Sequence, residues 1–221
     1  MSPETAVQEV LNSHWLPQIA ARIQEKLVNE KAARERFYDE MSESDKTEFI
    51  DGEVIVHSPA RDWHTEAVQN LQMLLHLWAK KLGGKVRSEK ALCVFKRNDY
   101  EPDIVYFGVE KAKSIGGETM KYPVPDFIVE VLSESTTKND RGVKFEDYED
   151  HGVLEYWIVD PKTQTLEQYV LGDTKQFKLA LKSNDGDVAS SSLKGFSIPI
   201  RAIFDEDLHQ AAIEKLMTDL K

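Results

Sequence analysis

The chain has 221 residues, of which 41% are hydrophobic and 30% are charged, a composition typical of a globular protein rather than a disordered one. Its 28 basic and 39 acidic residues give a net charge of −11, which disfavours a protein that coats nucleic acid or anionic membranes non-specifically. A single cysteine, Cys93, excludes an internal disulfide and a cysteine-based metal cluster, and its apolar neighbours predict a place in the core.

No export signal or membrane span is expected from the sequence. The N-terminal residues lack a basic segment followed by an apolar run. Charged residues interrupt every apolar stretch well before the roughly 18 residues that a spanning helix needs. We therefore expect a cytoplasmic protein with no membrane partner.

The first elements along the chain are helical. Residues 1–45 predict an N-terminal helical extension, in which apolar residues recur at helical spacing and Pro17 divides the stretch into two helices. Two short apolar runs flank an Asp-Gly pair and predict a β-hairpin over residues 47–56. Apolar residues spaced three and four apart predict an amphipathic helix over residues 64–82, which two glycines then end.

The rest of the chain alternates between strands and helices. Short apolar runs bounded by turn residues predict strands over 86–95, 102–107, 126–132, 154–159, 165–171, 177–181 and 196–200. A helix is predicted over 138–150, between two strands that this crossover allows to be parallel, and 183–192 is predicted to be a loop. The sequence thus predicts a mixed α/β domain over residues 46–205, followed by a C-terminal helix over 206–221.

Two acidic residues lie inside predicted strands and are the first candidates for a site. Asp103 and Glu130 each share a face of their strand with apolar side chains. Burying an ionised carboxylate without a partner costs several kcal/mol or shifts its pKa, so each acid needs a cation, a proton or a place at the open end of its strand. Two such carboxylates can share a divalent metal, but a Pro-Asp pair can also be an ordinary strand start.

A lysine and a basic segment add to the candidates. Lys144 and Tyr148 are four residues apart on the helix that follows the Glu130 strand, so that helix can bring a lysine back to the acids; the alternative is a solvated lysine on a charged helix. Residues 61–97 hold eight basic and three acidic residues, a local excess of +5. This segment either contacts a phosphate backbone or forms the solvated rim of a helix end.

Several motifs together resemble the Uma2-type family of candidate endonucleases, which is abundant in cyanobacteria. The motifs that carry the resemblance are Phe49–Val54, Ser58-Pro59 with His64, Glu101–Asp103, Pro125–Ser133, Asp140–Lys144 with Tyr148, and Gly152–Pro161. They occur in consistent order over about residues 47 to 200, and the Glu-Tyr-Trp-Ile-Val-Asp-Pro block is the most specific of them. The resemblance implies membership of the PD-(D/E)XK nuclease superfamily and a restriction-endonuclease-like core with a mixed central sheet flanked by helices.

The resemblance also implies roles for individual residues. Asp103 matches the Asp of the Pro-Asp motif and Glu130 the second acidic position. Leu132 stands where the simplest superfamily pattern has its lysine, and Lys144 matches a lysine displaced to the following helix. Four residues match possible positions at the edge of the site: Glu53, His64, Glu101 and Tyr148. Glu53 has the alternative role of a hairpin turn residue, and His64 that of a helix-start histidine.

The function implied by the resemblance is phosphodiester hydrolysis that depends on Mg²⁺, with Mn²⁺ as a possible substitute. Asp103, Glu130 and the backbone carbonyl of Val131 would hold the metal, and Lys144 would orient the attacking water or stabilise developing charge. DNA is the implied substrate and a homodimer the implied assembly. The alternative is a catalytically inactive binding or assembly module with a nuclease fold, favoured by Leu132 and by the acidic charge balance.

Overall fold

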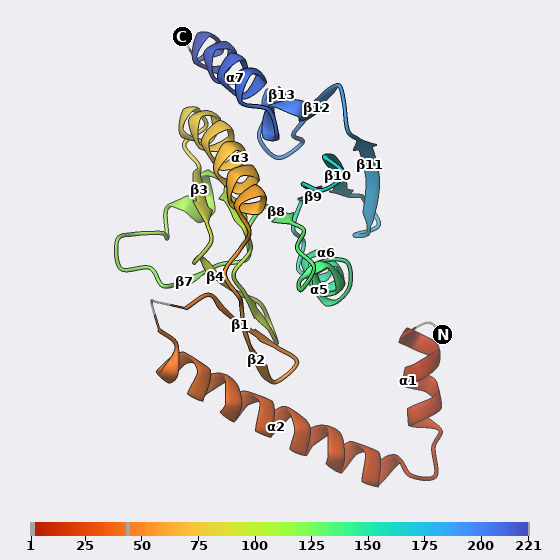
Figure 1. Cartoon of the computed structure of the whole chain (residues 1–221). Helices are drawn as coiled ribbons and strands as arrows, with labels where there is room; N and C mark the ends of the chain where they lie inside the picture. Colours follow the sequence, from red (N-terminus) through yellow and green to blue (C-terminus); the bar gives the residue numbers. More distant parts are fainter. Residues whose placement is uncertain (1–2, 43–44, 221) are drawn as a thin grey trace.

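A six-stranded mixed sheet forms the centre of the structure, a computed structural model that describes residues 3–42 and 45–220 (Figure 1). In sheet order, its strands are β11 (Phe177–Ser183), β10 (Thr165–Leu171), β9 (Glu155–Asp160), β8 (Phe127–Val131), β6 (Ile104–Phe107) and β3 (Lys85–Ser88). Strands β8 and β9 are parallel, and every other neighbouring pair is antiparallel. The predicted mixed α/β fold and the parallel crossover are therefore confirmed.

Both faces of this sheet are covered, and the alternation of side chains along β8 shows how. Phe127, Val129 and Val131 face a core shared with α3 (Asp62–Lys81) and α7 (Glu206–Asp219). Ile128 and Leu132 face the opposite core, which contains Tyr148 of α6 (Val143–Asp150). Glu130 lies between these two in the strand, so its side chain is directed toward α6.

A second sheet of five short strands packs beside this opposite core. Its strands, in order, are β2 (Glu53–Val56), β1 (Thr47–Ile50), β5 (Asp99–Tyr100), β4 (Leu92–Val94) and β7 (Lys121–Tyr122). The β1–β2 hairpin turns at Asp51 and Gly52, which have φ angles of 55° and 95°. Two consecutive left-handed residues suit a two-residue hairpin turn, so the predicted hairpin is confirmed. Cys93 in β4 is fully buried, as predicted.

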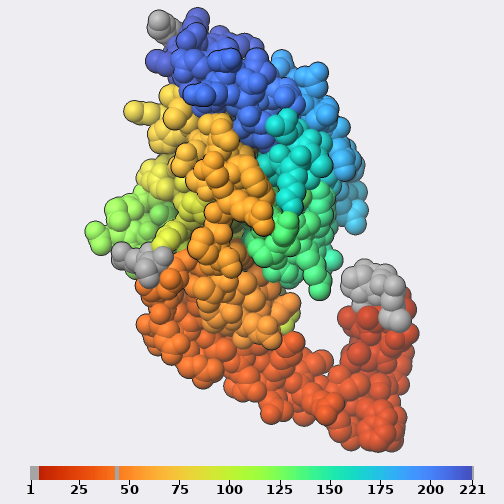
Figure 2. Space-filling view, viewed as in Figure 1, coloured from red at the N-terminus to blue at the C-terminus, as the bar shows by residue number. Residues whose placement is uncertain are grey.

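The N-terminal helices are attached to the second sheet at one end only. They are α1 (Pro3–Leu11) and α2 (Leu16–Glu40). The helical conformation is interrupted between them, and Pro17 lies in the first turn of α2. The C-terminal half of α2 is anchored by Arg34, which donates to Asp99 at 2.6 Å. The rest projects from the body of the molecule (Figure 2). The projecting part exposes six large apolar side chains: Val7, Leu11, Trp15, Ile23, Leu27 and Val28.

The remaining elements are short connections around the two sheets. They are α4 (Val109–Ala112), α5 (Thr137–Asp140), the strand pair β12 (Asp187–Ala189) and β13 (Ser197–Pro199), and the 3₁₀ turn η1 (Ile200–Ile203). Within the described ranges, no helix is both long and apolar enough to cross a membrane. Met1, Ser2, Glu43 and Ser44 of the predicted extension, and Lys221 of the predicted C-terminal helix, lie outside those ranges.

Three predicted elements differ from the observed ones. The run 86–95 is not one strand, because Glu89 adopts a left-handed φ of 63° and sends β3 and β4 into different sheets. The helix predicted over 138–150 is interrupted at Gly142, where a Cβ atom would lie 2.8 Å from the carbonyl oxygen of Lys138. The segment 183–192 is not entirely a loop, since it contains β12.

The packing of α3 on the central sheet gives a stability prediction. Leu71 is completely buried in the core under α3, whereas Met73 on the same helix is 51% exposed. We expect Leu71→Ala to lower the free energy of unfolding by about 2–5 kcal/mol, because it removes buried methyl groups and leaves a cavity. Met73→Ala should change it by less than about 1 kcal/mol. Urea denaturation measures both, and equal effects would contradict this packing.

Candidate active site

Asp103 lies directly before β6 and is only 4% exposed. Its Oδ2 accepts a hydrogen bond from the backbone N–H of Val131 at 2.8 Å, which joins β6 to β8 at this point. Its Oδ1 accepts from Nζ of Lys46 at 2.6 Å and lies 3.6 Å from Nε2 of His64. Burial by itself raises the pKa of Asp103, but Lys46 and His64 outweigh burial and hold that pKa below its ordinary value.

Glu130 lies beside Asp103 on the same face of the sheet and is 3% exposed. Its Oε1 accepts from the Tyr148 hydroxyl at 2.8 Å and from Nζ of Lys144 at 3.1 Å. Its Oε2 is 3.4 Å from the backbone nitrogen of Asp103, which donates to it. Burial raises the pKa of Glu130 to about 8; the neighbouring carboxylates add to this effect, and Lys144 opposes it.

Lys144 is buried among three carboxylates. Its Nζ lies 2.9 Å from Glu48 of β1, 3.1 Å from Glu130 and 3.3 Å from Asp140 of α5. Glu48 also has Nε2 of His57 at 3.0 Å. Although burial raises the pKa of Glu48, Lys144 and His57 lower it to about 2. Of the three carboxylates around Lys144, Glu48 thus has a lowered pKa, whereas burial raises the pKa of Glu130 and Asp140.

Taken together, the charges around these residues are unbalanced. Two ammonium groups, those of Lys46 and Lys144, form ion pairs with five carboxylates among the described residues: Glu48, Glu89, Asp103, Glu130 and Asp140. Buried carboxylates are stable only when they are protonated, paired or bound to a metal. The cluster therefore holds more carboxylates than ammonium groups, and the excess can be met by a proton, as the raised pKa of Glu130 indicates, or by a divalent cation.

A cavity of about 620 Å³ opens above this cluster. Asp103, Glu130 and Lys144 form part of its wall. Other residues that line it include Lys46, His57, Arg61, His64, Glu89, Lys90, Ser133 and Thr136. Acidic, basic and hydroxyl side chains therefore meet at one opening, and they come from the central sheet, from the segments before β1 and after β2, from α3 and from the segment before α5.

The four residues expected at the edge of the site lie at different places. His64 lines the cavity, and the Tyr148 hydroxyl donates a hydrogen bond to Glu130. Glu101 accepts from the backbone N–H of Thr47 at 2.8 Å and lines a different hollow, and burial raises its pKa to about 7. Glu53 is exposed at the start of β2 and faces the hollow beside α2, away from Asp103.

Four further members of the cluster were not predicted from the sequence. Glu48 is an acid within an apolar strand, the same pattern that identified Glu130. Asp140 precedes Lys144 by four residues, a helical spacing that places the two side chains on one face. Both residues could therefore have been found from the sequence. Lys46 and Glu89 lie in irregular segments beside β1 and β3, and no sequence pattern marks them as members of the cluster. The basic segment 61–97 is dispersed: Arg61 and Lys90 line the cavity, whereas the other basic residues of this segment do not.

Comparisons with known proteins agree with this architecture. Residues 34–201 match the model of the Uma2 family, which is described as "Putative restriction endonuclease". The chain belongs to this family. An uncharacterized protein of Synechocystis, sll1609, is 28% identical over 169 residues, which cover 73% of this chain and 93% of that protein.

A solved structure supports the fold. The crystal structure of a putative nuclease belonging to DUF820 from Anabaena variabilis superposes with a TM-score of 0.65 at 19% sequence identity. The match covers 80% of this chain and 96% of that one. This Uma2 protein therefore has the restriction-endonuclease-like core that its motifs imply.

The raised pKa of Glu130 gives a prediction for the metal-free protein. Between the ordinary pKa of 4.5 and the raised value of about 8, the folded state keeps a proton on Glu130 that the unfolded state has lost. Stability therefore decreases as pH rises through this window. Glu130→Gln should make that decrease smaller by about 1–3 kcal/mol, because it removes the titrating group.

Urea denaturation in EDTA at several pH values between 5 and 8 measures this difference. Glu35→Gln, at an exposed position of α2, is the matched control and should keep the wild-type slope. The same pH dependence in wild type and Glu130→Gln would contradict the raised pKa.

Proposed function

We propose that this Uma2 protein is a metal-dependent endonuclease that hydrolyses phosphodiester bonds in DNA. The observation that supports the proposal most is the paired burial of Asp103 and Glu130 on one face of β6 and β8, below a cavity. Oxygen ligands suit Mg²⁺, and the surplus of carboxylates over ammonium groups fits a divalent cation. Family membership supports nuclease chemistry in general terms.

In this proposal Asp103, Glu130 and the backbone carbonyl of Val131 hold Mg²⁺, and Mn²⁺ can replace it. Mg²⁺ held there would supply Lewis-acid chemistry, polarising the scissile phosphate and lowering the pKa of a bound water molecule. The hydrogen bond from Val131 to Oδ2 of Asp103 fixes that carboxylate, and Tyr148 fixes Glu130. Lys144 lines the cavity beside Glu130, where its ammonium favours negative charge that develops on the phosphate.

The proposal also includes the residues that contact DNA, the oligomeric state and the cellular compartment. Arg61 and Lys90 line the cavity and are the basic residues we assign to the DNA backbone near the scissile bond. We propose a homodimer, because cutting both strands of a duplex needs two such centres. A cytoplasmic location, where DNA is accessible, completes the proposal.

Cleavage of plasmid DNA with Mg²⁺ or Mn²⁺ tests this function. We expect Asp103→Ala and Glu130→Ala to reduce the cleavage rate by on the order of 100-fold or more, because each removes a ligand that would hold the metal. Glu35→Gln should cut as fast as wild type. Equal cutting by all of these proteins would remove the catalytic assignment.

The second candidate function is a binding or assembly module without turnover. It is favoured by Leu132 at the usual lysine position and by the burial of Lys144, which is 2% exposed and surrounded by three carboxylates. Calorimetric titration with Mg²⁺ distinguishes the two. The endonuclease should bind Mg²⁺ in a way that Asp103→Ala and Glu130→Ala weaken, whereas absence of such binding would favour the module.

A further inference from the structure

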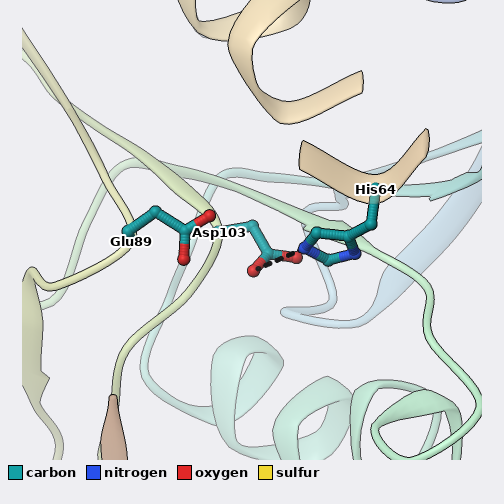
Figure 3. Close-up of side chains that lie close together, drawn as sticks. All are labelled: His64, Glu89 and Asp103. Carbon is teal, nitrogen blue, oxygen red and sulfur yellow. Dashed lines mark ion pairs between the residues drawn. The ribbon is translucent and has the colours of Figure 1, made fainter. Parts of the chain in front are cut away.

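An aromatic side chain forms part of the cavity wall close to the two acids. Trp63 lies in the first turn of α3, lines the cavity and is only partly buried. The centroid of its ring is 6.3 Å from that of His64, and Nε2 of His64 lies 3.6 Å from Oδ1 of Asp103. Figure 3 shows this imidazole next to the Asp103 carboxylate. One side chain therefore separates the indole of Trp63 from an acid of the candidate site.

Packing of the core does not account for this tryptophan. Trp78 and Trp157 are buried in the core shared with α3, and the Nε1 of each donates a hydrogen bond, to the carbonyl oxygen of Lys194 and to Glu155 respectively. Trp63 belongs to none of the three apolar clusters that the described residues form. Its indole is therefore available to stack on a ligand in the cavity.

The wall around Trp63 combines an apolar surface with a positive charge. Pro59 and Ala60, in the segment before α3, also line the cavity, and Arg61 follows them directly. All other residues that line the cavity are polar or charged. An apolar surface beside a guanidinium suits a nucleotide, because a base stacks on aromatic and apolar groups while its phosphate pairs with arginine.

The depth of the site favours a nucleotide that is unpaired. Asp103 and Glu130 are only 4% and 3% exposed, so a phosphate reaches them by entering the cavity. The cavity volume of about 620 Å³ is that of a pocket for a small ligand, whereas duplex DNA is stiff over about 150 base pairs and does not bend into such a space. A nucleotide that has left the base stack can enter it, as in enzymes that draw a base out of the duplex.

We propose that Trp63 stacks on an unpaired base next to the scissile phosphate, so that this Uma2 protein acts on single-stranded or locally opened DNA. Arg61 pairs with the backbone of the same strand. A closed duplex must first lose base pairs, so it binds more weakly than a single strand. The inference rests on the proposed function, because the phosphate that Trp63 positions is the one at Asp103 and Glu130.

Binding of fluorescein-labelled oligonucleotides to the full chain in EDTA tests the proposal without cleavage. The probes are a short oligothymidine, an abasic oligomer with the same number of phosphates, and a duplex of the same length. Wild type should bind the oligothymidine most tightly. Trp63→Ala should weaken that binding by about 5- to 150-fold, the effect of losing one base–aromatic stack, and should bind the abasic oligomer as wild type does.

Two further variants control for the loss of a large side chain. Trp63→Phe keeps an aromatic ring and should retain most of the affinity for the oligothymidine. Trp15→Ala removes a tryptophan that is 60% exposed on the projecting helices, and it should bind all three probes as wild type does. A role of Trp63 in folding alone predicts that Trp63→Ala weakens binding of the oligothymidine and the abasic oligomer equally, and that result would overturn the proposal.

Two results with wild type would also overturn it: tighter binding of the duplex than of the oligothymidine, and no preference for the oligothymidine over the abasic oligomer. The outcome is independent of the plasmid assay. Plasmid cleavage without base-dependent binding would reject the role of Trp63 and retain the endonuclease. Base-dependent binding that Trp63→Ala abolishes, without plasmid cleavage, would retain the stacking site and reject the endonuclease.

Discussion

The buried ammonium of Lys144 is the interaction on which the arrangement of the site depends. It forms ion pairs with Glu48 of β1, Glu130 of β8 and Asp140 of α5, so it connects both sheets to the helical segment after β8. A buried charge of this kind is tolerated only with close partners, and removing one partner is strongly destabilising. One ammonium cannot neutralise three carboxylates, and burial raises the pKa of Glu130 to about 8, so that without a metal Glu130 holds a proton that a cation can displace. The ion pairs that join these elements thus also leave carboxylate oxygens that a cation can bind.

The position of the cavity follows from the way the two sheets meet. Strands β6 and β8 are neighbours, and alternation places Asp103 and Glu130 on the face that is turned toward α6 and the second sheet. That face is otherwise apolar, and Tyr148 and Tyr156 are completely buried in it. The polar groups are therefore concentrated at one edge, where β1 and α3 begin. Hydrogen bonds from the backbone of β8 and from Tyr148 fix the two acids in a dry environment, which strengthens their interaction with any bound cation.

The candidate residues that the sequence singled out are those that depend on local pattern. Alternation and the Pro-Asp motif identified Asp103 and Glu130, and helical spacing identified Lys144 and Tyr148, which the structure brings to within hydrogen-bond distance of Glu130. The order of the main strands and helices was also predictable from apolar periodicity. The positions at which strands are interrupted were not predictable, because a single left-handed residue, Glu89, determines which sheet the next strand joins. The same turn places Glu89 beside Asp103, and Lys46 reaches both only through the pairing of β1 in the second sheet, so no spacing along the chain signals these contacts. Glu53, which matched by motif, faces away from the cavity.

The account's central claim is that the buried carboxylates of Asp103 and Glu130 bind a divalent cation together. The most direct measurement is a crystal structure of the protein grown with saturating Mn²⁺, with data collected to reveal the metal by its anomalous scattering. The account predicts an anomalous peak within coordination distance of a carboxylate oxygen from each of these two residues. A structure in which Mn²⁺ is found only on surface carboxylates, with Glu130 still bound to Lys144 and Tyr148 alone, would contradict it.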